Sequence, residues 1–303
     1  MTVGIVEMSQ GVRSVLIEFD GYKISQATLV KTLLFYENEI CFDSNWVVPS
    51  KVFKLPIAFE ENKTLACVTR YQGTIRSSAP WLSSNVDFIT NVNNISRQNI
   101  YNMMYSARFL ALGLGDVFLG SLCAVPLDPR QRLLGSKYNP SRTYTERGAI
   151  GLEGMYMCIY ATSSPGGYQL EGRTIPIWDK LSLSNFNKKY PWMLTPFDQI
   201  QFYPVLENEL ETLTEETEAG IFVVDVDEGT FDHGLYQQWL KENEGSINAF
   251  YEKQAGERKD NFIKLVQNLN KDLSTQQNSW HQPDSDEYPE NVTLIYSEYF
   301  GRF

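Results

Sequence analysis

Histidine is scarce in this chain of 303 residues, which contains only His233 and His281. Neither residue lies in an HxxxH pattern or near a pair of cysteines. A zinc site or a serine–histidine–aspartate relay would need histidines in such patterns, so the sequence argues against both chemistries. We therefore expect no metal site.

Cysteine, positive charge and long apolar runs are also in short supply. The four cysteines form no CxxC pair, which is typical of reduced packing residues and predicts no disulfide. The formal net charge of −11 argues against nucleic acid or an anionic membrane as a partner, because both attract clustered Lys and Arg. The chain has neither a membrane-length apolar run nor a secretion leader, so we expect a cytoplasmic protein that binds small molecules or proteins.

Two nucleotide-binding patterns are missing as well. The sequence contains no GxxxxGK[ST] segment, which argues against a phosphate-binding loop. The run GLGDVFLG (113–120) has Phe118 where a dinucleotide-binding loop requires its last glycine. It also follows a predicted helix and strand, which is the wrong end of a βαβ unit.

What is present indicates three regions. Residues 1–117 contain two strand-like runs (12–19 and 51–59) and two helix-like runs (24–40 and 94–109, starting near Ser96), which predict a small α+β domain with helices on one face of a sheet. In residues 118–205, short apolar runs alternate with Gly, Pro, Ser and Asn clusters, as in an antiparallel barrel or sandwich.

The third region, residues 206–303, is acidic and then helical. Residues 207–232 contain no Lys or Arg, so we expect them at the surface or against a basic neighbour. A helical apolar face follows at 262–273, and the last thirty residues are typical of a linker.

The stretch SSPGGYQLEGRT (163–174) allows two interpretations. In the first, Gly166 and Gly167 form a hairpin turn that needs positive φ, and Arg173 pairs with a nearby carboxylate. In the second, the glycines let the backbone approach a ligand, while amide and tyrosine side chains suit a ureido or amide group. Positive charge in the second interpretation comes from Lys137, Arg142 and Arg173.

Three motifs carry a family resemblance: KYNPSRT (137–143), GMYMCIY (154–160) and PGGYQLEGRT (165–174). Together with the surrounding run from 113 to 179, they resemble one half of the carboxyltransferase domain of urea carboxylase, the biotin-dependent part of urea amidolyase. A more distant likeness is to the family of the kinase inhibitor KipI and a component of 5-oxoprolinase. Members of that family have Trp at the position of Tyr168 and lack the long acidic-to-helical extension.

The resemblance implies a fold and a reaction. It implies a ferredoxin-like α+β domain over 1–117, a cyclophilin-like β-barrel over 118–205 and the extension over 206–303. It also implies transfer of CO2 from carboxybiotin to urea, giving allophanate, with a related acceptor such as guanidine left open. Biotin would come on a separate carrier domain, a biotin carboxylase domain would load it, and a second carboxyltransferase half would complete the active site. The chain is then expected to be inactive without that half.

The resemblance and the polar residues together suggest site residues. Lys137 and Arg142 are the predicted catalytic residues, which would stabilise the charge that develops on the biotin ureido oxygen. The predicted substrate-binding residues are Tyr138, Asn139, Gly166, Gly167, Tyr168, Gln169 and Arg173. The alternative is a KipI-like regulator that binds another protein through the barrel surface, or a 5-oxoprolinase component.

Overall fold

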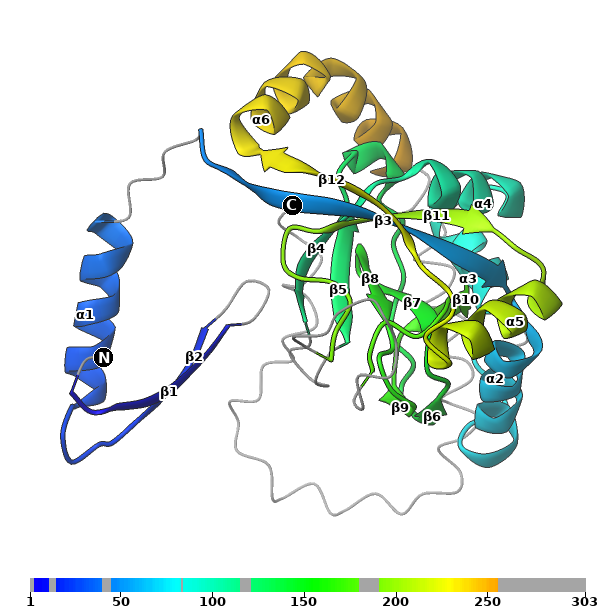
Figure 1. Cartoon of the computed structure of the whole chain (residues 1–303), viewed down its shortest axis with the longest axis horizontal. Coiled ribbons are helices and arrows are strands. Elements are labelled where there is room, and N and C mark those ends of the chain that lie inside the picture. The colour runs from blue at the N-terminus through cyan, green and yellow to red at the C-terminus, as the bar shows by residue number, and fades with distance from the viewer. Residues whose placement is uncertain are drawn as a thin grey trace, which may run out of the picture.

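A closed β-barrel forms the body of the protein in the computed structural model, which describes residues 3–10, 15–39, 45–82, 84–114, 121–179 and 191–255. Seven strands follow the order β10-β7-β8-β5-β4-β11-β3, and β10 pairs with β3 to close the ring. β12 adds to the other side of β3 (Figure 1). The strands are β3 (Val47–Phe59), β4 (Phe109–Leu114), β5 (Leu122–Pro126), β7 (Ala149–Glu153), β8 (Tyr156–Ile159), β10 (Gln169–Arg173), β11 (Gln199–Pro204) and β12 (Asp225–Asp232).

The barrel interior is filled by alternate residues of its strands. In β5 and β8, every second side chain is buried, and the residues between them are partly exposed. This period-two pattern is the expected signature of a strand with one face in a core. The interior cluster includes Ile57, Leu122, Ile150, Ile159 and Phe202.

The predicted barrel is confirmed, but it recruits strands from outside the predicted range. β3 and β4 belong to the segment that the sequence assigned to a separate α+β domain, and β4 pairs with β5. The predicted boundary near residue 117 therefore falls between two neighbouring strands of one barrel. A ferredoxin-like N-terminal domain is not confirmed, because β3 pairs with β11, β10 and β12 rather than with strands near it in sequence.

Three helices pack on the barrel, each with a side chain capping its first turn. They are α2 (Asn62–Thr74), α3 (Asn85–Asn93) and α4 (Arg97–Ser106). Ser96 caps α4, as the sequence predicts, by accepting a bond of 3.2 Å from the backbone N–H of Asn99. Helices α2 and α3 contact β10, so they support the strand that carries the glycine-rich motif.

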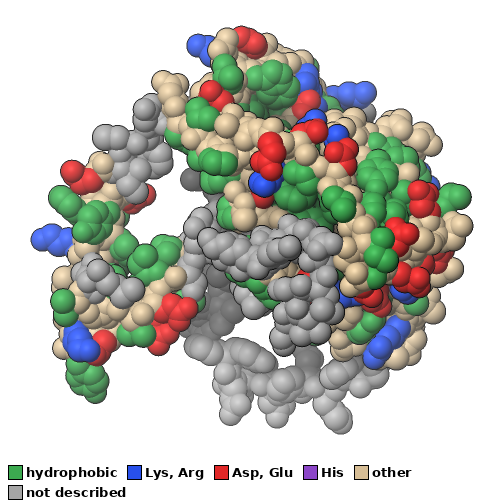
Figure 2. All heavy atoms as spheres, viewed as in Figure 1, with side chains coloured by type: hydrophobic (Ala, Val, Ile, Leu, Met, Phe, Trp, Pro, Cys, Tyr) green, Lys and Arg blue, Asp and Glu red, His purple; other side chains and the backbone are tan. Residues whose placement is uncertain are grey.

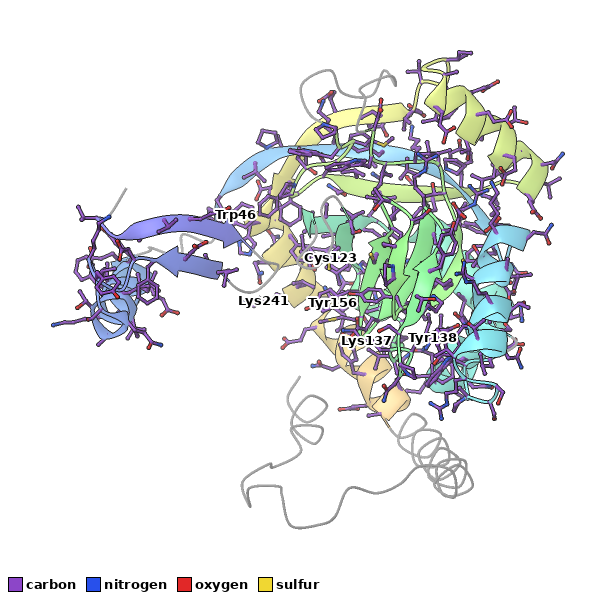
Figure 3. All side chains as sticks on the ribbon, turned by 90° about the horizontal axis from the view of Figure 1, so that it is seen from below. Trp46, Cys123, Lys137, Tyr138, Tyr156 and Lys241 are labelled. Atoms are coloured by element: carbon purple, nitrogen blue, oxygen red, sulfur yellow. The ribbon has the colours of Figure 1, made fainter. Side chains whose placement is uncertain are left out.

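Residues 3–39 form a separate unit, here called the N-terminal arm. It consists of the hairpin β1 (Ile5–Gln10) and β2 (Val15–Phe19) followed by α1 (Gln26–Glu39). The strand predicted at 12–19 is present as β2, and the helix predicted at 24–40 is present as α1. Figures 1 and 3 show the arm standing apart from the barrel, on the side where β3 begins.

The acidic segment lies on the surface and is paired with bases of the same chain. It forms α5 (Glu207–Glu218) and β12, and α6 (His233–Glu242) follows. Figure 2 shows acidic side chains grouped over α5. On β12, Asp225 and Asp227 lie 2.8 and 3.3 Å from Lys54 Nζ, which β3 supplies. The expected surface position is therefore observed.

Several predicted features lie outside the described residues. These are most of the glycine-rich run at 113–120, the amphipathic helix at 262–273 and the C-terminal linker. Between residues 3 and 255, no described helix combines the length and apolar character that crossing a bilayer requires.

A small two-stranded sheet and a short 3-10 helix are further elements of the fold. β6 (Arg142–Thr145) pairs with β9 (Ser164–Gly166), and α2 packs against β6. A 3-10 helix, η1 (Pro129–Gln131), follows β5 and begins at Asp128, which caps it. Two of the predicted site residues lie on the β6–β9 pair, since Arg142 begins β6 and Gly166 ends β9.

Candidate functional site

An outer-face cluster on the barrel unites two of the predicted site residues, Lys137 and Tyr168, with Glu153, Cys123 and Cys158. Cys123 of β5 and Cys158 of β8 are cross-strand partners. Both cysteines are partly exposed, whereas the residues before and after each of them in its strand are buried, so they face outward. Figure 3 shows Cys123 and Lys137 on the same side of the barrel.

Lys137 is the cation of the outer-face cluster. Its Nζ lies 2.8 Å from Glu153 Oε1, at the end of β7. The Lys137 side chain is 59% exposed and that of Glu153 is 24% exposed, so the pair remains open to an incoming molecule. The backbone around Lys137 is fixed by hydrogen bonds of 2.9 Å from Gly135 N to Gly154 O and 2.6 Å from Tyr138 N to Gly167 O.

Tyr168 supplies a neutral hydroxyl beside this pair. Burial, and then the charge of Glu153, raise the pKa of Tyr168 well above its usual value. Burial likewise raises the pKa of the Cys158 thiol. Both groups therefore keep their protons at neutral pH. The cluster presents one ammonium group, one carboxylate and neutral O–H and S–H groups on a single surface.

A glycine makes room for Tyr168. A Cβ atom at Gly151 would lie 2.7 Å from the Cβ of Tyr168, a separation too short for two carbon atoms. Glycine at this position of β7 therefore allows Tyr168 to lie against the outer face of the sheet.

Arg142 is placed differently from the prediction of a substrate-facing cation. It is only 1% exposed, and its guanidinium lies 4.4 Å from the centre of the Tyr138 ring. Its Nη1 donates a 2.7 Å hydrogen bond to the carbonyl of Tyr168, and its Nε donates one of 3.2 Å to Thr145 Oγ1. Arg142 thus supports the Tyr168 backbone from within the fold, and direct contact with a substrate stays a prediction that this burial disfavours.

Three predicted substrate-binding residues are also buried and engaged with protein partners. The Tyr138 hydroxyl bonds with Asn85 at 2.9 Å. Gln169 Nε2 donates to the Ser136 carbonyl at 2.7 Å. Arg173 pairs with Glu61, at 3.4 Å, and with Glu211. That pairing matches the first interpretation of the motif, in which Arg173 binds a carboxylate.

The two glycines of the motif do not form the predicted positive-φ turn, because neither has a left-handed backbone. At Gly166, a Cβ atom would lie 2.1 Å from the Tyr160 hydroxyl, so the position needs glycine for close packing. At Gly167, the nearest atom to such a Cβ is Lys137 Cγ at 3.6 Å, which is ordinary contact. Asn139 is exposed, and its carbonyl accepts a 3.0 Å bond from Arg76.

Glu153, Cys123 and Cys158 were not predicted as site residues. A signal was present for Glu153, the charged residue that ends the apolar strand β7 and precedes Gly154, a glycine with φ of 54° in the β7–β8 turn. Nothing in the local sequence says that Lys137 folds back onto this turn. Within the part of the chain that the structure describes, no three His, Cys, Asp or Glu residues are grouped to hold a metal ion.

The structure is a closed barrel with an ammonium, a carboxylate and a hydroxyl group on its outer face, and comparison with known families shows which class of protein it belongs to. The chain belongs to the carboxyltransferase domain family, subdomain C and D, which it matches over residues 1–186.

Individual relatives show which members of the family the chain resembles. The chain is 62% identical over all of its 303 residues to the urea amidolyase of Saccharomyces cerevisiae, of which it spans 16%. The crystal structure of the Kluyveromyces lactis urea carboxylase is similar, with 60% identity, a TM-score of 0.83 and coverage of 96% of this chain and 25% of that one. A 5-oxoprolinase component of Bacillus subtilis is 22% identical over 137 residues, covering 44% of this chain and 52% of the relative. This chain therefore corresponds to about one sixth of its amidolyase relative.

Proposed function

We propose that this chain is one half of a biotin-dependent carboxyltransferase, the part of a urea carboxylase that transfers CO2 from carboxybiotin to urea to form allophanate. The observation that carries the proposal is the 62% identity to a urea amidolyase along the entire chain. The outer-face cluster supports it, because the reaction needs exposed hydrogen-bond donors on a defined surface. We also infer that the barrel is of the cyclophilin-like type.

The donors in the cluster fit a ureido group. Bound carboxybiotin would supply the CO2 that is transferred. The Lys137 ammonium would bind the ureido oxygen and stabilise its developing negative charge. The neutral Tyr168 hydroxyl would donate a second hydrogen bond to the same oxygen, since its raised pKa keeps its proton in place.

Glu153 has two tasks in this proposal. Its carboxylate holds Lys137 Nζ at 2.8 Å, which fixes the position of the cation. Its remaining acceptor sites would receive N–H groups of urea, orienting the urea nitrogen toward the CO2. The planar acceptor guanidine remains a second candidate substrate of the same site, and the second carboxyltransferase half would exclude water from it.

The other predicted residues would act mainly through these groups. Arg142 would position Tyr168 through its carbonyl, and Gly166 would let Tyr160 pack beneath the motif. Exposed Asn139 could contact substrate directly. Biotin carrier and biotin carboxylase domains of the same longer, cytoplasmic protein would deliver and load the biotin. The regulator and 5-oxoprolinase alternatives have weaker support, since the 5-oxoprolinase match covers under half of this chain.

A pair of lysine variants in the full-length protein tests the proposal. Replacing Lys137→Met should lower urea-dependent allophanate formation on the order of 10²-fold, as loss of one charge-stabilising donor commonly does. The control is Lys51→Met, because Lys51 also forms a 2.8 Å surface ion pair, with Glu228, on another part of the barrel. The melting temperature of both variants should match that of the parent, since surface ion pairs contribute little to stability.

Equal activity of the two lysine variants would remove Lys137 from the mechanism. A parent protein that makes no allophanate from urea, bicarbonate and ATP would refute the function itself.

A further inference from the structure

We propose that the N-terminal arm is the docking element through which this chain binds the other half of the same carboxyltransferase domain in the full-length protein. The inference rests on the proposed function for the identity of the partner. The arm itself was not among the predicted site or partner surfaces.

The arm exposes apolar side chains that a free surface would not require. Within the described residues, eleven of the seventeen exposed large hydrophobic side chains belong to the arm. On α1, Val30, Leu33 and Leu34 are 46%, 38% and 53% exposed and share one helical stripe by their i, i+3, i+4 spacing. Figure 2 shows hydrophobic side chains at the surface of the arm. Contiguous exposed apolar surface of this kind usually marks an interaction site.

The arm cannot cover these side chains by itself. Leu29 is the buried residue of α1, and on the hairpin Val6, Met8 and Leu16 are each more than half exposed. A two-stranded hairpin with one helix is too small to build a core of its own. The described elements of the barrel do not cover it either, because the arm stands apart from them in both views (Figures 1 and 3). A stable arm therefore needs a partner surface.

The longer protein is the source of that surface. The family match begins at residue 1, so the arm is part of the family's domain and not an appended tail. The solved urea carboxylase covers 96% of this chain at a TM-score of 0.83, so the same arm occurs within a much longer polypeptide. The matching family model is described as subdomains C and D of the carboxyltransferase domain, so under the proposed function the rest of that domain is the partner.

Hydrogen exchange in the full-length protein tests the docking. The test variant is Val30→Gln/Leu34→Gln, which makes the stripe polar, and the matched control is Lys31→Gln, an exposed change on the same helix. In the parent, the α1 amides should be strongly protected. Exchange of these amides should accelerate at least tenfold in the double variant and stay within about twofold of the parent in the control. In the isolated 303-residue chain, both variants should have the same melting temperature as the parent sequence.

Three outcomes would overturn the docking proposal. Unprotected α1 amides in the full-length parent would show that nothing covers the stripe. Equal exchange in the double variant and Lys31→Gln would show that the stripe is not the contact. A dimer of the 303-residue chain that dissociates in the double variant would assign the surface to a second copy. Exchange is measured separately from allophanate formation, so a protected arm in a protein without urea carboxylation refutes the function and not the docking.

Discussion

Glu171 is a buried acid within the motif SSPGGYQLEGRT. It lies inside the barrel, and neither of its carboxyl oxygens has a hydrogen-bond partner among the described residues. Burial raises its pKa to about 8, so the group is mostly neutral at pH 7. The other residues around its small cavity are Met104, Phe109, Pro126, Gln131, Leu133, Leu152, Met155 and Met157.

The raised pKa of Glu171 predicts that stability falls as pH rises. Below about pH 4.5 the side chain is neutral in both the folded and the unfolded chain, and its ionisation then costs nothing. Between about pH 4.5 and 8 the unfolded chain releases this proton while the folded chain retains it, so the free energy of unfolding decreases. Glu171→Gln removes this dependence, and we expect it to be more stable than the parent by a few kcal/mol at pH 8 and about equal at pH 4.5.

Guanidinium chloride unfolding of both proteins at the two pH values measures the effect. The same pH dependence in parent and Glu171→Gln would show that Glu171 is ionised or solvated in the folded protein.

Residues of the motif SSPGGYQLEGRT lie in different surroundings in the structure. Tyr168 faces the outer cluster, Glu171 faces the interior, and Arg173 pairs with Glu61, which caps α2, and with Glu211 of α5. The register of β10 against β7 shifts between Leu170 and Gly172, so closeness in sequence does not place these side chains in one site.

At the scale of secondary-structure elements, the pairing of two strands, β10 and β3, closes the barrel. Gly172 pairs with Phe59, and Arg173 pairs with Ala58. A Cβ atom at Gly172 would lie 2.2 Å from the Ala58 carbonyl oxygen, which is backbone and cannot rotate away. The glycine of EGRT is therefore required by the strand approach that closes the ring.

Gly172→Ala should accordingly separate β10 from β3. We expect a loss of about 3 kcal/mol in the free energy of unfolding, the upper part of the usual range for overpacking. Gly73→Ala in α2 is the matched control, because nothing lies within 4 Å of a Cβ there and alanine favours helix. Chemical denaturation of both variants checks the difference. A Gly172→Ala protein as stable as the control would mean that the β10–β3 seam moves freely.

At the scale of the whole molecule, the chain is a folded barrel with two surfaces that could bind a neighbouring domain. Part of the acidic segment is paired within the chain, since Lys54 and Lys63 pair with Asp225 and Glu211 at 2.8 Å. The outer-face cluster and the N-terminal arm, in contrast, both present groups to the outside. We therefore expect this barrel to function in contact with another domain.

The 303-residue chain alone should therefore be folded and inactive. Its circular dichroism spectrum should be that of a mixed α and β protein with a cooperative thermal transition, because one core spans the barrel strands. With carboxybiotin and urea it should form no allophanate above the uncatalysed rate, since the second half is needed to close the site against water. Catalytic turnover by the chain alone would show that this half contains a complete active site.

Local signals in the sequence determined much of this protein. The strand at 51–59, the start of α4 at Ser96 and the surface position of the acidic run follow from β-branched content, capping and charge, all of which act over a few residues. The motifs KYNPSRT and PGGYQLEGRT identified the family. Lys137 and Tyr168 were predicted as site residues, and in the structure Glu153 lies beside both of them; their role in catalysis stays a prediction.

Only the tertiary structure decided which polar side chains reach the surface. Arg142, Gln169 and Arg173 have the composition of a binding site, yet all three are buried. Gln169 and Arg173 lie on β10, which pairs with β7 and β3 in the closed barrel, whereas Arg142 lies on the separate β6–β9 sheet against the Tyr138 ring. Glu153 joined the cluster because the loop carrying Lys137 is bonded back to Gly154 and Gly167. Such contacts join segments far apart in sequence, and their stability comes from packing across the whole barrel, which no short stretch of residues encodes.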